Sequence, residues 1–236
     1  MPDNRLPTLL LTRPRPQSLA FLALCEARAG QPLPHHIAPV ITISDVPVAD
    51  LGPPGASLIF TSVHAVARAG TGEGRTAFCV GDRTAEAARV AGFDAHSAAG
   101  DAAALIALIR DARPEGPLTY LRGAHAAADI AGALRAAGFA TEARIVYRQD
   151  PVGLAPPDLA ALGDEPHFLA PVFSPLSART LSGSLGALGE RAHVISISQS
   201  VRTAWEGPVA SNVVARAPNA EAMADCVAQL ALPSAC

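Results

Sequence analysis

The sequence contains no lysine, and all 18 of its basic residues are arginine. Catalysis through a Schiff base, attachment of pyridoxal phosphate and the phosphate-binding lysine of a P-loop all require a primary amine, so each is excluded. Arginine keeps its charge at any working pH. We therefore interpret the basic side chains as groups that bind carboxylates and not as bases.

Aromatic residues are also scarce, at 4% of the chain, which argues against stacking platforms for nucleic-acid bases. The formal net charge is −3, so the chain lacks the basic excess of a nucleic-acid-binding protein. No apolar stretch reaches 18 residues, and the apolar run near the first residue is too short for a signal peptide. We expect a cytoplasmic protein with no nucleic-acid partner and no membrane partner.

Patterns typical of metal or nucleotide sites are missing. The four cysteines form no CxxC pair and lie far apart, at Cys25, Cys79, Cys226 and Cys236. We interpret them as plain thiols. The neighbours His35 and His36 would point to opposite faces of an extended segment, and neither HxxxH nor HExxH spacing occurs. GxGxxG and P-loop patterns are absent as well. The sequence predicts neither a metal nor a cofactor.

What the sequence does contain is a repeated pattern of a short apolar strand, a loop and a helix. Half of its 236 residues are apolar, so the chain can form one large domain or two small ones. Leu9–Leu11 precede Arg13 and a helical pattern that ends in glycine. Leu118–Leu121 precede Arg122 and a second such helix. The two segments therefore look like copies of one unit.

Two further strand patterns also occur twice. Residues 58–62 match residues 171–175, and each is an apolar run that ends in a small hydroxyl residue. Residues 78–81 match residues 194–198, and each precedes a helix that contains alanine and arginine. Any two α/β units share patterns of this kind, but the order of the units agrees in both halves. We therefore predict an internal duplication.

Strands that alternate with amphipathic helices predict an α/β fold of parallel sheets flanked by helices, with ligands bound beyond the carboxyl ends of the strands. The arginine-bearing unit is the first unit of one copy and the last unit of the other, which predicts a discontinuous domain. We predict one lobe from residues 1–40 plus 149–236 and an inserted lobe from residues 44–147. Val40–Ser44 and Ile145–Gln149 would join the two lobes as a two-strand connection that acts as a hinge.

Candidate functional residues lie where strands end. Gly81 opens a helix, where free backbone amides attract anions, although a tight-turn glycine is the alternative. Arg13 and Arg122 occupy equivalent places and are either ligand-binding groups in a common cleft or salt-bridge partners. Tyr147 falls on the predicted connection, where its phenol could donate a proton or pack as an ordinary aromatic side chain. We interpret His125 as a solvated loop residue.

Several short motifs, taken in order over nearly the whole chain, resemble uroporphyrinogen-III synthases. They are the LLLTRP start, Pro39-Val40, Ile59-Phe60-Thr61-Ser62, Val80-Gly81 with Thr84-Ala85, Tyr120-Leu121-Arg122-Gly123, Val146-Tyr147, Phe173-Ser174-Pro175 and the helix after Pro218-Asn219. The series and its spacing are specific, although no single motif is. The resemblance implies two α/β lobes, the first of them discontinuous, joined by two strands.

The resemblance also implies a lyase of tetrapyrrole and heme biosynthesis that uses no metal or organic cofactor. Such enzymes cyclise hydroxymethylbilane, a linear tetrapyrrole, to uroporphyrinogen III. The reaction loses water and inverts ring D through a spiro intermediate. A transient hand-over from hydroxymethylbilane synthase would supply the substrate, and we expect a monomer.

Particular residues take roles from the same resemblance. Tyr147 matches the tyrosine that is proposed in the family to help the terminal hydroxyl leave. The substrate carries eight carboxylates, which need many donors. The residues that the resemblance assigns to substrate binding are Arg13, Thr61, Ser62, Gly81, Thr84, Arg122, Gly123, Ser174, Ser198 and Gln199. Ser198 departs from the family pattern, which often has glycine there.

The substrate-binding assignments depend on free backbone amides, which occur at the N-termini of helices. We expect helix N-termini directly after Thr61-Ser62, Gly81, Gly123 and Ser174. Two other classes of protein are alternatives: a two-lobed, non-catalytic small-molecule binding or sensor protein, which would share the hinge and cleft, and an unrelated α/β transferase. The missing signal peptide disfavours an exported binding protein, and the missing nucleotide loops disfavour the transferase.

Overall fold

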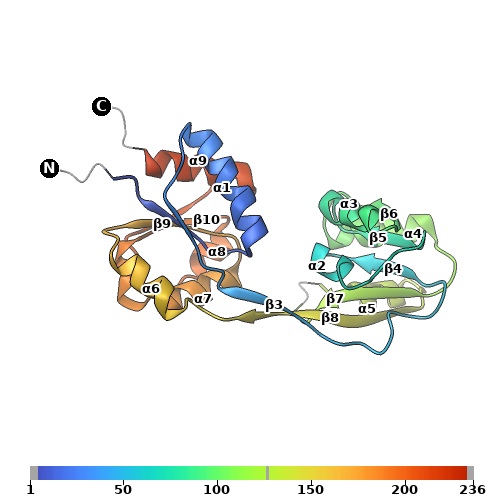
Figure 1. Ribbon diagram of the computed structural model, residues 1–236. Coiled ribbons are helices and arrows are strands. Elements are labelled where there is room, and N and C mark those ends of the chain that lie inside the picture. Colours follow the sequence, from blue (N-terminus) through green and yellow to red (C-terminus); the bar gives the residue numbers. More distant parts are fainter. Residues whose placement is uncertain (1–4, 126–127, 233–236) are drawn as a thin grey trace. The chain divides into compact units, whose positions relative to one another are not determined.

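The computed structural model describes residues 5–125 and 128–232 (Figure 1). Cys236 lies outside the described residues. The chain divides into two compact units, and we call Met1–Thr42 with Asp150–Cys236 unit 1 and Ile43–Gln149 unit 2. Among the described residues, no helix is long and apolar enough to cross a membrane.

Unit 1 contains one five-stranded sheet with the order β11-β10-β9-β1-β2, in which every neighbouring pair is parallel. Its elements are β1 (Thr8–Leu11), α1 (Arg15–Ala29), β2 (His35–Ile37), α6 (Pro156–Gly163), β9 (Phe168–Val172), α7 (Pro175–Leu185), the 3-10 helix η1 (Gly186–Arg191), β10 (Ala192–Ser196), α8 (Gln199–Thr203), β11 (Ser211–Val214) and α9 (Ala220–Ala231).

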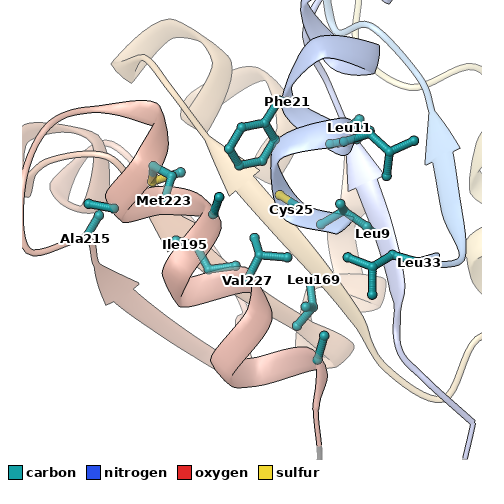
Figure 2. Close-up of a cluster of buried hydrophobic side chains, with 14 residues drawn as sticks. Leu9, Leu11, Phe21, Cys25, Leu33, Leu169, Ile195, Ala215, Met223 and Val227 are labelled. Atoms are coloured by element: carbon teal, nitrogen blue, oxygen red, sulfur yellow. The ribbon is translucent and has the colours of Figure 1, made fainter. Parts of the chain in front are cut away.

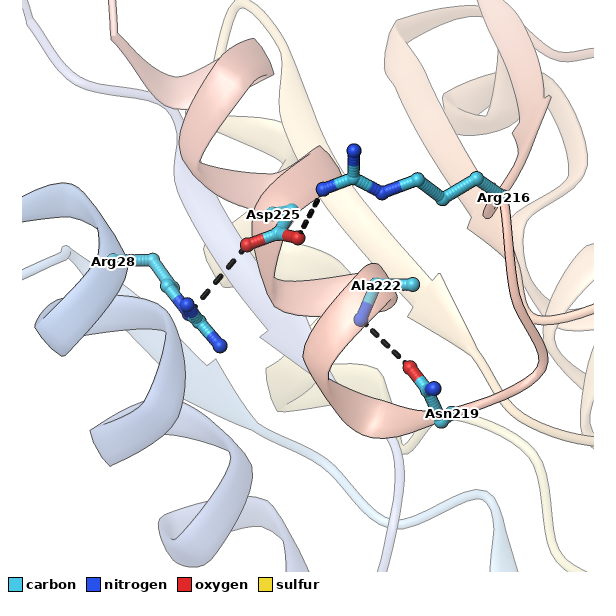
Figure 3. Close-up of polar contacts among 5 residues, drawn as sticks. All are labelled: Arg28, Arg216, Asn219, Ala222 and Asp225. Atoms are coloured by element: carbon cyan, nitrogen blue, oxygen red, sulfur yellow. Dashed lines mark hydrogen bonds and ion pairs between the residues drawn. The ribbon is translucent and has the colours of Figure 1, made fainter.

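The core of unit 1 lies between α1, α9 and the sheet, where Phe21, Cys25, Met223 and Val227 meet buried strand residues (Figure 2). Asn219 caps α9 by accepting a hydrogen bond from the amide of Ala222 at 2.9 Å (Figure 3). The same view shows Asp225 of α9 paired with Arg28 of α1 and with Arg216. Helix α1 ends at Gly30, whose positive φ of 69° suits glycine.

Unit 2 contains a six-stranded sheet with the order β3-β8-β7-β4-β5-β6. Its elements are β3 (Ile41–Asp45), β4 (Ser57–Phe60), α2 (Val63–Val66), β5 (Thr76–Cys79), α3 (Asp82–Val90), β6 (Asp94–Ser97), α4 (Ala102–Ala112), β7 (Leu118–Gly123), α5 (Ile130–Ala136) and β8 (Thr141–Pro151). The chain enters unit 2 within β3 and leaves it within β8, and these two strands are neighbours in the sheet.

Two apolar cores cover the two faces of the unit 2 sheet. One packs α2 and α3 against strand residues such as Phe60 and Leu121. The other packs α4 and α5 against Ile59, Phe78 and Tyr120. Alternate residues of a strand point to opposite faces, so consecutive positions such as Ile59 and Phe60 belong to different cores. The predicted α/β class, with mostly parallel sheets flanked by helices, is confirmed.

The two sheets have the same strand order once the repeated patterns are matched. Unit 1 reads β2-β1-β9-β10-β11 and unit 2 reads β8-β7-β4-β5-β6, with β3 added at one edge. The segment β1-α1-β2 that opens the chain is the counterpart of β7-α5-β8. This displaced but equivalent order supports the predicted duplication.

Three local predictions need correction. Helix α5 begins at Ile130, so Gly123 does not directly precede a helix; it ends β7. Arg122 lies within β7 and not beyond it. The structural counterparts in the second pattern are the helix caps Ser62 and Ser174, one residue out of step with the sequence match.

Candidate functional site

The first two loops of unit 2 place capped helix N-termini at the carboxyl ends of neighbouring strands, and we call this edge of the sheet the working edge. Ser62 follows β4 and accepts a hydrogen bond from the amide of His64 at 3.2 Å, which caps α2. Gly81 follows β5 and caps α3 with an extended backbone, φ −148° and ψ 165°. The amides at the start of such a helix have no carbonyl partner in the helix and are free to meet an anion.

The fold does not require glycine at position 81. Its backbone conformation is open to any residue, and a Cβ added there would meet no atom within 4 Å. The glycine therefore leaves room beside the amides of α3. Such room serves a ligand that approaches the backbone closely.

Tyr147 reaches the working edge of unit 2 through a β-bulge. Leu121 and Arg122 of β7 face Arg144 and Ile145 of β8, but the next residue, Gly123, faces Tyr147. The skipped residue on β8 shifts the alternation, so the consecutive Val146 and Tyr147 both point into the core under α2 and α3. Bulges of this kind turn a side chain towards a site.

Gly123 is the residue that makes room for the Tyr147 ring. A Cβ on Gly123 would lie 2.7 Å from Cζ of Tyr147 and 3.0 Å from its hydroxyl oxygen. Such distances are well inside van der Waals contact, so only glycine fits. The backbone amide of Ala124 donates a hydrogen bond to the carbonyl of Tyr147 at 2.9 Å, which fixes the two strands at this point. The glycine after Arg122 therefore sets the position of the phenol.

Two residues of the α2 segment surround the Tyr147 ring. The His64 ring lies 5.7 Å away by centroids, and the Arg68 guanidinium lies 5.8 Å from the ring centroid. Arg68 donates to the carbonyl of His64 at 2.9 Å and pairs with Asp45. Burial lowers the pKa of His64, and the charges of Arg68 and Arg83 lower it further. Among the described residues, nothing hydrogen-bonds to the Tyr147 hydroxyl.

His64 and Arg68 were not among the predicted site residues. The only signal for them is that they follow Thr61-Ser62 in the loop after a buried strand. Their contact with Tyr147 depends on the bulge in β8, more than 70 residues further along the chain.

Arg122 and Tyr120 lie on the opposite face of the same sheet edge. The Tyr120 hydroxyl is 3.1 Å from Oγ1 of Thr61. Burial raises the pKa of Tyr120, so its phenol stays protonated at neutral pH. Arg122 donates through Nη1 to the carbonyls of Gly123 and Ala124 at 2.9 and 3.1 Å. The guanidinium is thereby held in place at the end of β7.

Unit 1 has serine-rich loops at the corresponding places. Ser174 follows β9 and caps α7 by accepting from the amide of Ser177 at 3.1 Å. Ser198 follows β10 and caps α8 with an extended backbone, φ −156° and ψ 167°. Its hydroxyl lies 2.9 Å from that of Ser200. The side chain of Gln199 reaches Thr203 at 3.4 Å.

Arg13 follows β1 and stacks on an aromatic ring. Its guanidinium carbon lies 4.5 Å from the centroid of Phe173, which in turn packs edge-on against Phe21 at 5.0 Å. The Ser18 hydroxyl donates to the carbonyl of Arg13 at 2.8 Å and steadies the turn into α1.

The structure thus brings the predicted residues of unit 2 to one sheet edge, with Tyr147 and Gly123 on one face and Arg122 on the other. Thr84 differs from the others. Its side chain is buried, and its amide already donates to the carbonyl of Gly81 at 3.0 Å.

Two cysteines are buried, one in the core of each unit. Burial raises the pKa of Cys25 to about 12 and that of Cys79 to about 11, so both stay protonated at neutral pH. Among the described residues, no group of three or more His, Cys, Asp or Glu side chains could hold a metal ion.

Comparisons with known proteins agree with this architecture. A model of the family uroporphyrinogen-III synthase HemD matches residues 22–225. No curated protein sequence matches the chain. The crystal structure of uroporphyrinogen-III synthetase from Helicobacter pylori 26695 superposes with a TM-score of 0.65 at 18% identity, covering 84% of this chain and 93% of that one. This likeness shows the fold.

Two structures from the extremely thermophilic bacterium Thermus thermophilus also match. A mutant uroporphyrinogen III synthase gives a TM-score of 0.48 at 19% identity, covering 94% of this chain and 98% of that one. The wild-type enzyme in another crystal form gives 0.41 at 18% identity, covering 94% and 97%.

Proposed function

The chain belongs to the uroporphyrinogen-III synthase family, and we propose which of its residues carry out that family's reaction. The activity is cyclisation of hydroxymethylbilane to uroporphyrinogen III, with loss of water and inversion of ring D. The observation that carries this function is the family match over residues 22–225.

Tyr147 is the proton donor in this proposal. Departure of the terminal hydroxyl as water requires a proton and leaves an azafulvene cation. The phenol supplies that proton, and the proton released when the cyclised pyrrole regains its aromaticity restores the phenol. The support is geometric: the bulge in β8 turns Tyr147 into the core beside α2 at the carboxyl end of β7, and Gly123 leaves space for its ring.

Substrate carboxylates bind, in this proposal, to amide-rich loops in each unit. In unit 2 the donors are the first amides of the helices capped by Ser62 and Gly81, with Thr61 and Gly123 beside them. In unit 1 they are the loops at Ser174, Ser198 and Gln199. Arg13 and Arg122 add charge-assisted hydrogen bonds. Thr84 contributes by shaping the α3 turn.

We also propose a cytoplasmic monomer that takes hydroxymethylbilane from its synthase by a transient hand-over. The hand-over follows from the chemistry, because free hydroxymethylbilane closes spontaneously to isomer I. Sedimentation velocity should give a single species near 24.1 kDa. A larger species would overturn the monomer. A ratio of isomer III to isomer I that does not change with the amount of added synthase-bound substrate would overturn the hand-over.

The deciding experiment is incubation with enzymatically generated hydroxymethylbilane, followed by oxidation and separation of the uroporphyrin isomers. We expect isomer III in excess, against a control without protein that gives isomer I. Isomer I alone, formed at the spontaneous rate, would exclude the function.

A further inference from the structure

The two equivalent arginines have different surroundings in their units. Arg13 follows β1, and Arg122 occupies the corresponding place at the end of β7. In unit 1 the guanidinium is covered by Phe173, the residue that corresponds to Thr61 in unit 2. Thr61 is too small to cover Arg122 and instead contacts the Tyr120 hydroxyl. Thr61 therefore offers Arg122 no ring of the kind that Phe173 offers Arg13.

A cavity of about 520 Å³ lies beside Arg122 in unit 2, over β7 and β8 and against α5. Its lining includes Tyr120, Arg122, His125, Asp129 and Arg135, with Ala131 on its apolar side. This volume lies within the range of small-molecule sites, about 300 to 1,000 Å³. It is large enough for one pyrrole ring with its two carboxylate side chains.

The cavity favours an anion. Two guanidinium groups line it, against the single carboxylate of Asp129. That carboxylate is already engaged, because it accepts a hydrogen bond from the amide of Gly132 at 2.8 Å and caps α5.

Both arginines are held by the backbone yet keep donors for a ligand. Arg122 uses only Nη1 for its two carbonyl contacts, and Arg135 uses only Nη1 for the carbonyl of Thr141 at 3.1 Å. Each guanidinium has five N–H donors, so several remain on each. Fixed, forked donors of this kind suit a carboxylate.

We propose that this cavity, lined by Tyr120, Arg122 and Arg135, is a carboxylate subsite that receives one acetate- and propionate-bearing pyrrole ring of the substrate. The subsite rests on the proposed function for the identity of that ring. It assigns binding roles to Tyr120 and Arg135, which the sequence patterns did not single out. Arg135 lies on α5 and does not contact Tyr147, so its role is in binding and not in proton transfer.

Arg135→Gln is the sharpest kinetic test. Loss of one partly exposed charged donor should raise KM about five- to thirtyfold and leave kcat within about twofold. Arg135→Lys, which keeps the charge, should recover part of the loss. Arg110→Gln on α4 is the matched control, because it removes an exposed arginine that does not line the cavity. Arg122→Gln is less clean, since Arg122 also holds the carbonyl beside Tyr147.

Ionic strength separates charge recognition from a purely structural role. The wild-type KM should rise with added salt, and this rise should be weaker in Arg135→Gln. A KM and salt response in Arg135→Gln equal to those of Arg110→Gln would overturn the subsite.

Binding of tricarballylate, a small tricarboxylate, tests the cavity without turnover. In the 15N-labelled full chain, the amides of Ala124 and Ala131 should shift saturably, and Arg135→Gln should weaken binding at least about fivefold. Shifts that do not saturate, or that the substitution leaves unchanged, would overturn the subsite. Failure of the wild-type chain to form isomer III would instead remove the proposed function, and the titration would still decide whether the cavity binds carboxylates.

Discussion

Unit 1 and unit 2 share a strand order but differ in the side chains that follow their strands. In unit 2 the carboxyl ends carry a phenol, an imidazole and a guanidinium in contact, at Tyr147, His64 and Arg68. In unit 1 they carry serine caps and Arg13 stacked on Phe173. The same scaffold thus carries ionisable side chains in contact with one another in unit 2 and hydrogen-bonding loops in unit 1. We expect substitutions around Tyr147 in unit 2 to change kcat and those in the loops of unit 1 to change KM.

The strand pairing shows where this difference begins. In unit 1, β1 and β2 pair in a regular register from Leu9 and His35 to Leu11 and Ile37. The equivalent pair in unit 2, β7 and β8, is interrupted between Arg122 and Gly123. One skipped residue turns Tyr147 towards α2. The ladder of β1 and β2 ends at Leu11 and Ile37, before the place that corresponds to this bulge.

Tyr147→Phe should produce the largest effect. Removing the phenol deletes the proposed proton donor but keeps the ring, so kcat should fall about ten- to a thousandfold, or about 1.4 to 4 kcal/mol in the barrier. Ser174→Ala, which removes a cap in unit 1, should instead raise KM with little change in kcat. Steady-state kinetics with isomer analysis measures both. Wild-type kcat in Tyr147→Phe, with isomer III still formed, would remove the tyrosine from the mechanism.

Gly123→Ala should come next, because it displaces the same phenol without deleting it. The new methyl group would lie 2.7 Å from Cζ of Tyr147 and must push the ring aside. A shift of this size should lower kcat about ten- to a hundredfold. In a Tyr147→Phe background the same change should lower kcat less than about twofold, since the proton donor is already gone.

The control for Gly123→Ala is Gly183→Ala in α7 of unit 1, where an added Cβ meets no atom within 4 Å. Its kcat should match wild type. Additive losses in the double variant would show that Gly123 acts on the fold and not through Tyr147. Thermal unfolding of each variant distinguishes the two cases.

Gly81→Ala and Ser198→Gly change the corresponding N-cap positions of the two units. Neither backbone is strained and Gly81 has open space, so both variants should fold like wild type. If the substrate approaches the α3 amides closely, Gly81→Ala should raise KM about three- to tenfold, the worth of one hydrogen bond. Ser198→Gly should lower KM about twofold. Equal KM values in all three proteins would show that neither cap is approached by substrate.

Much of the fold was predictable because it depends on local patterns. Apolar runs, caps such as Asn219 and the αL glycine Gly30 mark elements through short-range chemistry that the sequence displays. The repeated patterns predicted an internal duplication, and the shared strand order of the two sheets supports it. The sequence match aligned Thr61 with Ser174, one residue out of step. The counterpart of Ser174 is Ser62, because both cap helices, and a pattern of hydroxyl residues does not distinguish Ser62 from its neighbour Thr61.

The site was predictable only in part, because its geometry depends on pairing between distant strands. Tyr147 could be named from its motif, but its direction depends on a bulge that no residue pattern displays. Gly123 was expected to lead into a helix, whereas its lack of a side chain accommodates Tyr147. Arg135 was missed because it is an ordinary exposed arginine on α5 until the sheet brings it beside Arg122. Long-range packing, not local propensity, places these groups.

The smallest effect we expect concerns acid stability, where each unit has a histidine with a lowered pKa. In unit 2 it is His64 at the working edge; in unit 1 it is His193, near the start of β10. Burial and the neighbouring His167 lower the pKa of His193 below its usual 6.5, and Ser211 hydrogen-bonds to it at 2.9 Å.

The unfolded state binds the His193 proton more tightly than the folded state does. Neutral His193 therefore makes its full contribution to the free energy of unfolding above pH 6.5, and this contribution is lost as the pH falls through the lower folded pKa. His193→Asn should therefore show a smaller drop in the urea midpoint between pH 7.5 and pH 5 than wild type does. Trp205, the only tryptophan, lies in unit 1 and reports this transition by fluorescence. An identical drop in both proteins would place the acid sensitivity of unit 1 elsewhere, and kcat at pH 7.5 should be unchanged because His193 lies at the end of the sheet opposite the binding loops.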